Sequence, residues 1–235
     1  MTDIWSYLTQ GPLLWLTLTL AAFAVADAIS RAAGRSPLAN PVMLSVVVLG
    51  TLLWASSTPY PVYFEGAQFV HFLLGPATVA LALPIRDNLR HVGRAALPLA
   101  AALIAGSATA AVTAVGIGWA MGLDGEILAS LAPKSATAPV AIGISETIGG
   151  LPTLTAVLVL LTGMIGAITV TPMMNGLGIT DWRARGFAVG VAAHGIGTAR
   201  AFQVNPVAGA FAGLGMGLNA IATAFIAPWA LGLFE

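Results

Sequence analysis

The only lysine of the chain, Lys134, lies in the segment Pro-Lys-Ser-Ala-Thr-Ala-Pro at residues 133–139, within apolar sequence. Charged and hydroxyl side chains at membrane depth cost free energy and are usually functional. Pro139 has no N–H to donate to the Ser135 carbonyl, and a helix that begins here would direct free N–H groups and its positive dipole end at a ligand. Lys134, Ser135 and Thr137 are therefore predicted to bind an anion such as a carboxylate. The alternative is that Lys134 extends to a membrane interface and Pro139 only kinks a helix.

A second polar segment, Ala-His-Gly-Ile-Gly-Thr-Ala-Arg, occupies residues 193–200. Gly195 and Gly197 allow the backbone to come close to a small ligand. Thr198 could donate a hydrogen bond to it, and Arg200 could hold a carboxylate through its planar guanidinium. Histidine is the side chain that ordinarily titrates near neutral pH, which makes His194 a candidate proton carrier as well as a substrate contact. The alternatives are that Arg200 serves only membrane topology and that His194 is a packing residue.

Two further polar residues complete the predicted site. Glu146 lies in Ser-Glu-Thr at residues 145–147, and it is a candidate proton group or a partner for Lys134; it could also lie at the outer interface. Asn219 lies in the last apolar stretch, where it is counted among the substrate-binding candidates and could also bridge helices.

Both segments must be positioned by elements that are almost free of charge. Hydrophobic residues make up 58% of the 235 residues and charged residues 8%, with a mean hydropathy of +0.92, whereas a soluble domain has about 25% charged residues. The uncharged stretches are long enough for spanning helices of about 20 residues. The composition predicts an all-α, polytopic membrane protein with interrupted or re-entrant helices. We expect a single integral membrane domain over residues 1–235, with about six to eight hydrophobic elements.

The sequence lacks the features of nucleic-acid binding, metal binding and common enzyme classes. Acidic and basic residues balance at nine each, so no nucleic-acid partner is expected. The chain has no cysteine and three scattered histidines, which argues against disulfides, iron–sulfur clusters and a dedicated metal site. It has no phosphate-binding loop, no His-Glu-x-x-His motif and no nucleophile elbow. We therefore expect a protein that is not an enzyme and needs no cofactor or metal.

Prolines, glycines and charges divide the chain into its expected elements. The element at residues 66–84 should be kinked at Pro76. A small face made by Gly163 and Gly166 should allow close helix packing. The expected elements span residues 12–28, 41–56, 66–84, 95–121, 127–150 (interrupted), 153–177, 186–202 (interrupted) and 207–233.

The loop charges predict an orientation. Arginines follow the first and third elements, and the positive-inside rule places both loops in the cytoplasm. If residues 127–150 crossed the membrane fully, Arg183 and Arg185 would lie outside. If these residues form a re-entrant hairpin, both arginines return to the cytoplasm, so the rule favours a hairpin. The loop arginines are Arg31, Arg35, Arg86, Arg90 and Arg94, and Glu65, Asp124 and Glu126 are then outside.

At these residues the chain resembles the LrgB/CidB family. The motifs that carry the resemblance are Phe-Leu-Leu-Gly-Pro-Ala-Thr-Val-Ala-Leu-Ala at 72–82, the two polar segments at 133–139 and 193–200, Gly-Met-Ile-Gly-Ala at 163–167, Arg-Gly at 185–186 and Gly-Met-Gly-Leu-Asn at 215–219. The resemblance covers nearly everything after about residue 35, and the two polar segments together are quite specific for it. Ala136 departs from the valine or threonine that is usual in the family.

The resemblance implies two functions. The family is described as modulating murein hydrolase export and cell lysis with a small holin-like LrgA/CidA protein. Its plant plastid relatives resemble glycolate/glycerate transporters, and some bacterial members look linked to pyruvate. The resemblance does not choose the substrate.

Our leading prediction is a secondary active transporter of small monocarboxylates of the glycolate, glycerate or pyruvate class. Interrupted helices that meet at mid-membrane are typical of inverted-repeat carriers, in which one bundle moves against another by an elevator-like or rocking motion. The alternative is a non-enzymatic modulator of a holin-like partner. By analogy with such carriers we expect a homodimer, in the lipid bilayer of the inner (plasma) membrane.

Overall fold

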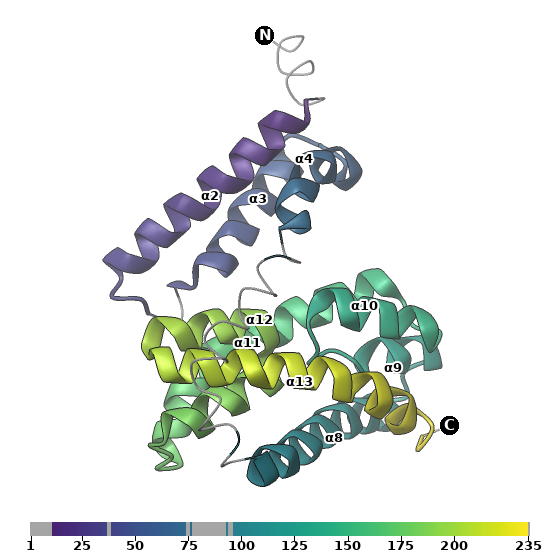
Figure 1. Ribbon diagram of the computed structural model, residues 1–235. Coiled ribbons are helices and arrows are strands. Elements are labelled where there is room, and N and C mark those ends of the chain that lie inside the picture. The colour runs from purple at the N-terminus through teal and green to yellow at the C-terminus, as the bar shows by residue number, and fades with distance from the viewer. Residues whose placement is uncertain (1–10, 37–38, 74–75, 77–92, 94–95, 235) are drawn as a thin grey trace. The chain divides into compact units, whose positions relative to one another are not determined.

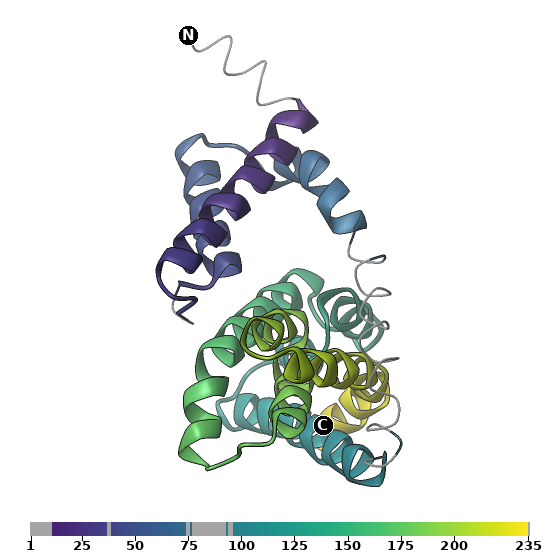
Figure 2. The same ribbon diagram turned by 60° about the vertical axis from the view of Figure 1, so that its left-hand side comes forward.

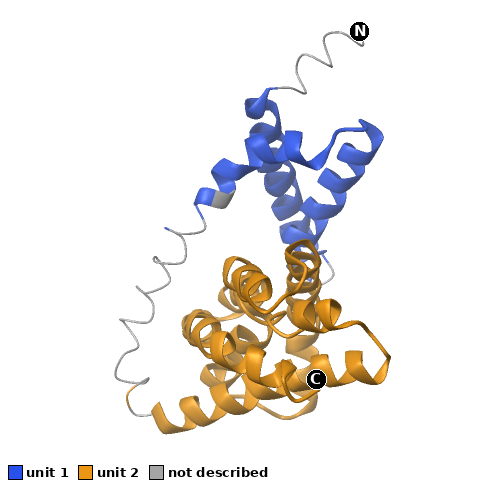
Figure 3. Cartoon of the chain, turned by 90° about the vertical axis from the view of Figure 1, so that its right-hand side faces the viewer, with its two compact units in different colours: residues 1–80 blue, residues 81–235 orange. Residues whose placement is uncertain are grey.

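The computed structural model describes residues 11–36, 39–73, 76, 93 and 96–234 (Figure 1). Within these ranges the regular elements are helices, and no strand occurs. The all-α prediction is confirmed. The chain divides into two compact units, residues 1–80 and residues 81–235 (Figure 3). The single membrane domain over residues 1–235 stays a prediction.

The first unit contains three helices: α2 (Pro12–Ala32), α3 (Pro41–Ala55) and α4 (Tyr60–Phe72). Prolines in the first turn begin α2 and α3, where a missing N–H costs nothing. Asn40 caps α3 by accepting a hydrogen bond from the Val42 N–H at 2.9 Å. Trp15 is fully buried and packs edge-on against Tyr63, with ring centroids 5.9 Å apart. The first three predicted elements begin in this unit, although α4 begins at Tyr60 rather than at the predicted residue 66. The residues around Pro76 and those of the basic loop at 86–94 lie almost entirely outside the described ranges.

The second unit contains α8 (Ala96–Ala120), α9 (Gly125–Leu131), α10 (Ala138–Thr147), α11 (Pro152–Gly176), α12 (Trp182–Val204) and α13 (Pro206–Leu231). Figure 2 shows α13, in yellow, beside the green α12. The two helices meet backbone to backbone. A Cβ atom on Gly186 would lie 2.1 Å from the Ala208 carbonyl oxygen, and one on Gly190 would lie 2.0 Å from the Ala212 carbonyl oxygen. Small residues therefore permit the close packing that membrane helices use.

Four of the described helices are long and apolar enough to cross a membrane: α2, α8, α11 and α13. This confirms the prediction of a polytopic membrane protein. The helices α9 and α10 have 7 and 10 residues, too few for the roughly 20 that a crossing needs. They belong to the first interrupted segment of the sequence analysis.

The first interrupted segment folds back on itself. Ser130, near the end of α9, and Ser145, near the end of α10, meet at Thr155 of α11. The Thr155 hydroxyl lies 2.7 Å from the Ser145 hydroxyl and 3.2 Å from the Ser130 carbonyl oxygen, and all three residues are fully buried. Because residues 130 and 145 lie together, the chain must reverse between them. We call residues 125–147 the first hairpin.

The second interrupted segment, α12, also folds back. Its helix is broken at Ala193 (φ −130°, ψ 17°) and at His194 (φ 40°, ψ −131°). A Cβ atom on Gly197 would lie 3.0 Å from the Val189 carbonyl oxygen, although a continuous helix would hold residues eight apart at about 12 Å. The two arms of α12 therefore lie against each other. We call residues 182–204 the second hairpin.

Candidate anion-binding site at two helix breaks

The first helix break occupies the tip of the first hairpin. The Lys134 N–H donates to the Leu131 carbonyl at 3.2 Å and the Ala136 N–H to the Pro133 carbonyl at 2.9 Å, so tight turns replace the helix here. The helix α10 then begins after Thr137, whose hydroxyl makes no capping hydrogen bond, with Pro139 in its first turn. Pro139 thus starts a helix rather than kinking one. The positive dipole end of α10 lies beside the polar residues of the break.

Lys134 is half-buried at this break. Its ammonium group donates to the Ser135 hydroxyl at 3.3 Å, and Ser135 is buried. Among the described residues, Lys134 forms no ion pair. The predicted pairing with Glu146 is not formed, because Glu146 is exposed at the opposite end of α10. Eight residues of helix separate the two ends by about 12 Å.

One buried amide holds the first break against the rest of the unit. Asn219 of α13 is 1% exposed and donates from Nδ2 to the Ser135 carbonyl at 3.0 Å. Its Oδ1 accepts from the Ser107 hydroxyl of α8 at 2.6 Å and from the Thr223 hydroxyl at 3.3 Å. These bonds favour the helix-bridging interpretation of Asn219 over direct substrate contact. The sequence analysis did not single out Ser107, because Thr109 and Thr113 lie close to it in the same helix and are equally good candidates by residue type.

The second helix break is fitted into the small face of α11. His194 is 4% exposed, and its Nε2 lies 2.9 Å from the Val159 carbonyl oxygen. Because a carbonyl only accepts, Nε2 carries a proton and the other ring nitrogen is left as an acceptor. A Cβ atom on Gly163 would lie 2.6 Å from Cε1 of His194, and one on Gly166 would lie 2.3 Å from Cβ of Ala193. The predicted glycine face of α11 therefore packs against the broken residues Ala193 and His194.

Val159 brings the two breaks together. Its side chain, 1% exposed, packs with Ala136 and Ala141 of the first hairpin, and its carbonyl accepts from His194 of the second. The tips of the two hairpins thus both contact this one residue of α11.

Two residues of the second predicted segment lie elsewhere. The Thr198 hydroxyl donates to the His194 carbonyl at 2.7 Å and lies 4.0 Å from the Met216 sulfur, so it supports the first turn of the second arm. Arg200 lines a separate cavity with Arg185, at the opposite end of the hairpin from His194. The sequence analysis treated Arg185 as a topological charge and as part of a family motif, not as a site residue. Among the described residues, no cluster of three or more histidine or acidic side chains could hold a metal.

These elements define a polytopic helical membrane protein whose two broken hairpins meet on one helix. The chain belongs to the LrgB-like family, whose sequence pattern matches residues 19–233. It is 32% identical to an uncharacterized protein of Haemophilus influenzae over 92% of this chain and 93% of that one. It is 28% identical to the holin-like protein CidB of Staphylococcus epidermidis, over 85% of this chain and 87% of the relative. It is also 24% identical to the antiholin-like protein LrgB of Bacillus cereus, over 94% and 96%.

No solved structure matches the chain. The family prediction of the sequence analysis is confirmed. The relatives' names favour the alternative of that analysis, a modulator of a holin-like partner, over its leading prediction of a carrier. No relative's name given above mentions a substrate.

Proposed function

We propose that this chain binds a small monocarboxylate between its two helix breaks and carries it across the inner membrane. The observation that supports this most is the position of Val159, which contacts the tips of both hairpins. Irregular backbone at membrane depth persists where it is buried in protein or lines a wet cavity. Two such breaks on one helix form the kind of site that carriers build at mid-membrane.

In this proposal, the first hairpin supplies the positive charge. Lys134 attracts the carboxylate, and the Ser135 and Thr137 hydroxyls donate to its oxygens. The N-terminus of α10 adds N–H groups and the positive end of its dipole. Charge-assisted hydrogen bonds of this kind replace the water shell of the anion.

The second hairpin supplies the proton group. The Nε2 proton of His194 is committed to the Val159 carbonyl, so the remaining ring nitrogen accepts a proton that enters with the substrate. Glu146 is exposed at the end of α10, and we assign it to the approach of a coupling proton rather than to the substrate. Thr198 supports the second break, and Arg200 lies outside this site.

The second candidate function is modulation of a holin-like partner, and the relatives' names support it more directly than they support transport. A modulator would act through contact with a small LrgA/CidA-like membrane protein. The polar site would then be structural, or it would gate the partner. The two candidates differ in whether the chain acts alone.

Counterflow into liposomes separates the two candidates. The purified full chain, reconstituted alone, should accumulate labelled glycolate, glycerate, lactate or pyruvate against excess internal unlabelled substrate. Lys134→Ala should lower the apparent affinity about thirtyfold, since loss of the charged partner of a half-buried carboxylate costs about 2 kcal/mol, the lower end of the range for buried pairs. Arg183→Ala is the matched control, because it removes an exposed cation remote from both breaks.

Each outcome decides between the candidates. Saturable counterflow with an affinity that Lys134→Ala lowers and Arg183→Ala preserves supports the carrier. If the wild type shows no counterflow, yet changes dye leakage through a co-reconstituted LrgA/CidA-like protein, the modulator is correct. If Lys134→Ala transports like the wild type, the site assignment is wrong.

A further inference from the structure

A long cavity lies along α8, on the side where the first arm of α12 packs; we call it the α8 cavity. Its volume is about 440 Å³. It extends along residues 98–110 of α8 and along residues 181–192 at the start of the second hairpin. At 1.5 Å of rise per helical residue, these stretches are about 18 Å and about 16 Å long. Neither Lys134 nor His194 lines the α8 cavity, so it is separate from the two helix breaks.

The walls of the α8 cavity are apolar over nearly its whole length. Its most buried lining residues are Phe187 and Val191 of α12 and Phe211 of α13, which are 3%, 4% and 1% exposed. Small residues that leave the space between the helices open line the rest of it: Ala102, Gly106, Ala110, Ala184, Ala188 and Ala192. Ordered water needs two or more polar partners, and such walls offer few, so an apolar ligand suits this space better.

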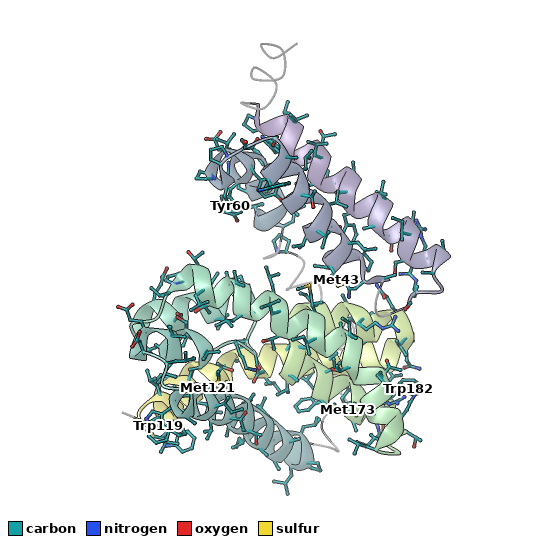
Figure 4. The ribbon with its side chains drawn as sticks, turned by 180° about the vertical axis from the view of Figure 1, so that it is seen from behind. Met43, Tyr60, Trp119, Met121, Met173 and Trp182 are labelled. Carbon is teal, nitrogen blue, oxygen red and sulfur yellow. The ribbon has the colours of Figure 1, made fainter. Side chains whose placement is uncertain are left out.

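The two charged residues that line the α8 cavity lie at one end of it and neutralise each other. Nε and Nη2 of Arg183 donate to the Asp181 carboxylate at 3.0 Å and 2.6 Å. The hydrogen bonds from the Arg183 side chain hold the pKa of the Asp181 carboxyl below its usual value, so the pair is ionised and has no net charge at neutral pH. Trp182, labelled in Figure 4, lies between them at the beginning of α12. Tryptophan is typical of the membrane interface, so we expect the charged end there and the apolar length within the bilayer.

We propose that the α8 cavity binds one hydrocarbon chain of a membrane lipid, with the lipid headgroup at the Asp181–Arg183 pair. Nonbonded carbon atoms pack about 4 Å apart, so an extended chain is about 5 Å wide and about 18 Å of it fills about 350 Å³. The cavity, at about 440 Å³, has room for one such chain. The same length of a partner's α-helix, about 10 Å wide, would fill about 1400 Å³ and does not fit. This site does not depend on transport.

The test is photo-labelling of the purified full chain in phosphatidylcholine liposomes that contain a phosphatidylcholine probe with a diazirine on one acyl chain. Phe187, Val191 and Phe211 are too buried to be reached from the surrounding bilayer, so labels on them report a chain inside the α8 cavity. Mass spectrometry of peptides should find these labels in the wild type. Ala102→Trp should lower them about fivefold or more, because the large indole occupies the cavity. Ala101→Trp adds the same side chain at an exposed position of α8 that does not line the cavity, and it should label like the wild type.

The headgroup should matter little, because the ion pair at the mouth has no net charge. A phosphatidylglycerol probe with the same acyl chain should therefore label the three buried residues to within about twofold of the phosphatidylcholine probe. The proposal is overturned if the wild type carries no label on these residues, if Ala101→Trp lowers labelling as much as Ala102→Trp, or if only phosphatidylglycerol labels them. A second copy of the chain in the cavity would leave them unlabelled, and Ala102→Trp would then change the oligomeric state, which also overturns the proposal. Should Ala102→Trp fail to fold, Ala102→Leu replaces it with a loss in the same direction.

Discussion

Replacement of Asn219 by leucine tests whether one amide holds the first helix break. Leucine has the same branched arrangement of four side-chain heavy atoms as asparagine, so the change removes the polar atoms and leaves no cavity. The Ser135 carbonyl then loses the Nδ2 donor that lies 3.0 Å away. A buried carbonyl without a partner costs about 1–3 kcal/mol.

The other two hydrogen-bond partners of Asn219 should contribute less to the loss of stability. The Ser107 and Thr223 hydroxyls can turn to the carbonyl four residues earlier in their own helices, as Thr113 does to Thr109 at 2.6 Å. Hydrogen bonds between membrane helices average about 0.6 kcal/mol and reach about 1.7 kcal/mol. We therefore expect Asn219→Leu to lower the free energy of unfolding by about 1–3 kcal/mol.

The assay is equilibrium unfolding of the purified protein in detergent, with Ser107→Ala as the matched control. Ser107→Ala removes one donor but leaves Asn219 bonded to Ser135 and Thr223, so it should cost under about 1 kcal/mol. The free energies of unfolding of the two variants should therefore differ clearly. If Asn219→Leu costs no more than Ser107→Ala, the amide does not hold the break, and the argument fails.

Two further predictions concern the second break and the orientation. Gly163→Ala should lower the free energy of unfolding by about 1–3 kcal/mol, because its Cβ would lie 2.6 Å from the His194 ring. Gly143→Ala is the control, because nothing lies within 4 Å of the Cβ atom that it adds, and it should be neutral or stabilise by up to about 1 kcal/mol. If thermal unfolding shows the same loss of stability for both variants, His194 does not fit against α11 as described. Single cysteines in this cysteine-free chain should react with an impermeant reagent from outside at positions 65 and 124, and not at positions 31 and 90. Outside labelling at position 90 would overturn the orientation.

Much of the helical framework could be predicted from the sequence. Prolines mark the first turns of α3, α11 and α13, and the observed helices begin within one residue of the predicted elements. The loop charges favoured a hairpin at residues 127–150, and the hydrogen bonds of Thr155 bring its two ends together. These features depend on neighbouring residues or on charge, so they can be predicted from one sequence.

The partners of the polar residues could not be predicted in the same way. Ser107 and Asn219 are separated by 112 positions, and many other hydroxyls in apolar helices are equally good candidates by residue type. Arg200 stands six positions from His194, which suggested one site. The reversal of α12 instead brings Arg200 to a cavity that Arg185 also lines. Such pairings depend on where the chain turns back, and the residue types alone do not determine that.

One face of α11 links the two hairpins. Its buried residues Thr155, Val159, Gly163 and Ala167 recur every four positions, so they form a single stripe along the helix. Thr155 closes the base of the first hairpin, Val159 contacts both breaks, and Gly163 receives His194.

Separate motion of either hairpin would break this stripe, exposing the Val159 carbonyl and opening the fit at Gly163. Close-packed contacts of this kind resist gradual deformation. If the chain is a carrier, the two hairpins and α11 should therefore move as one body, with the bound anion between the breaks. Disulfide cross-linking of cysteines placed at 155 and 145 would then leave counterflow intact, whereas loss of counterflow would show that the first hairpin must part from α11.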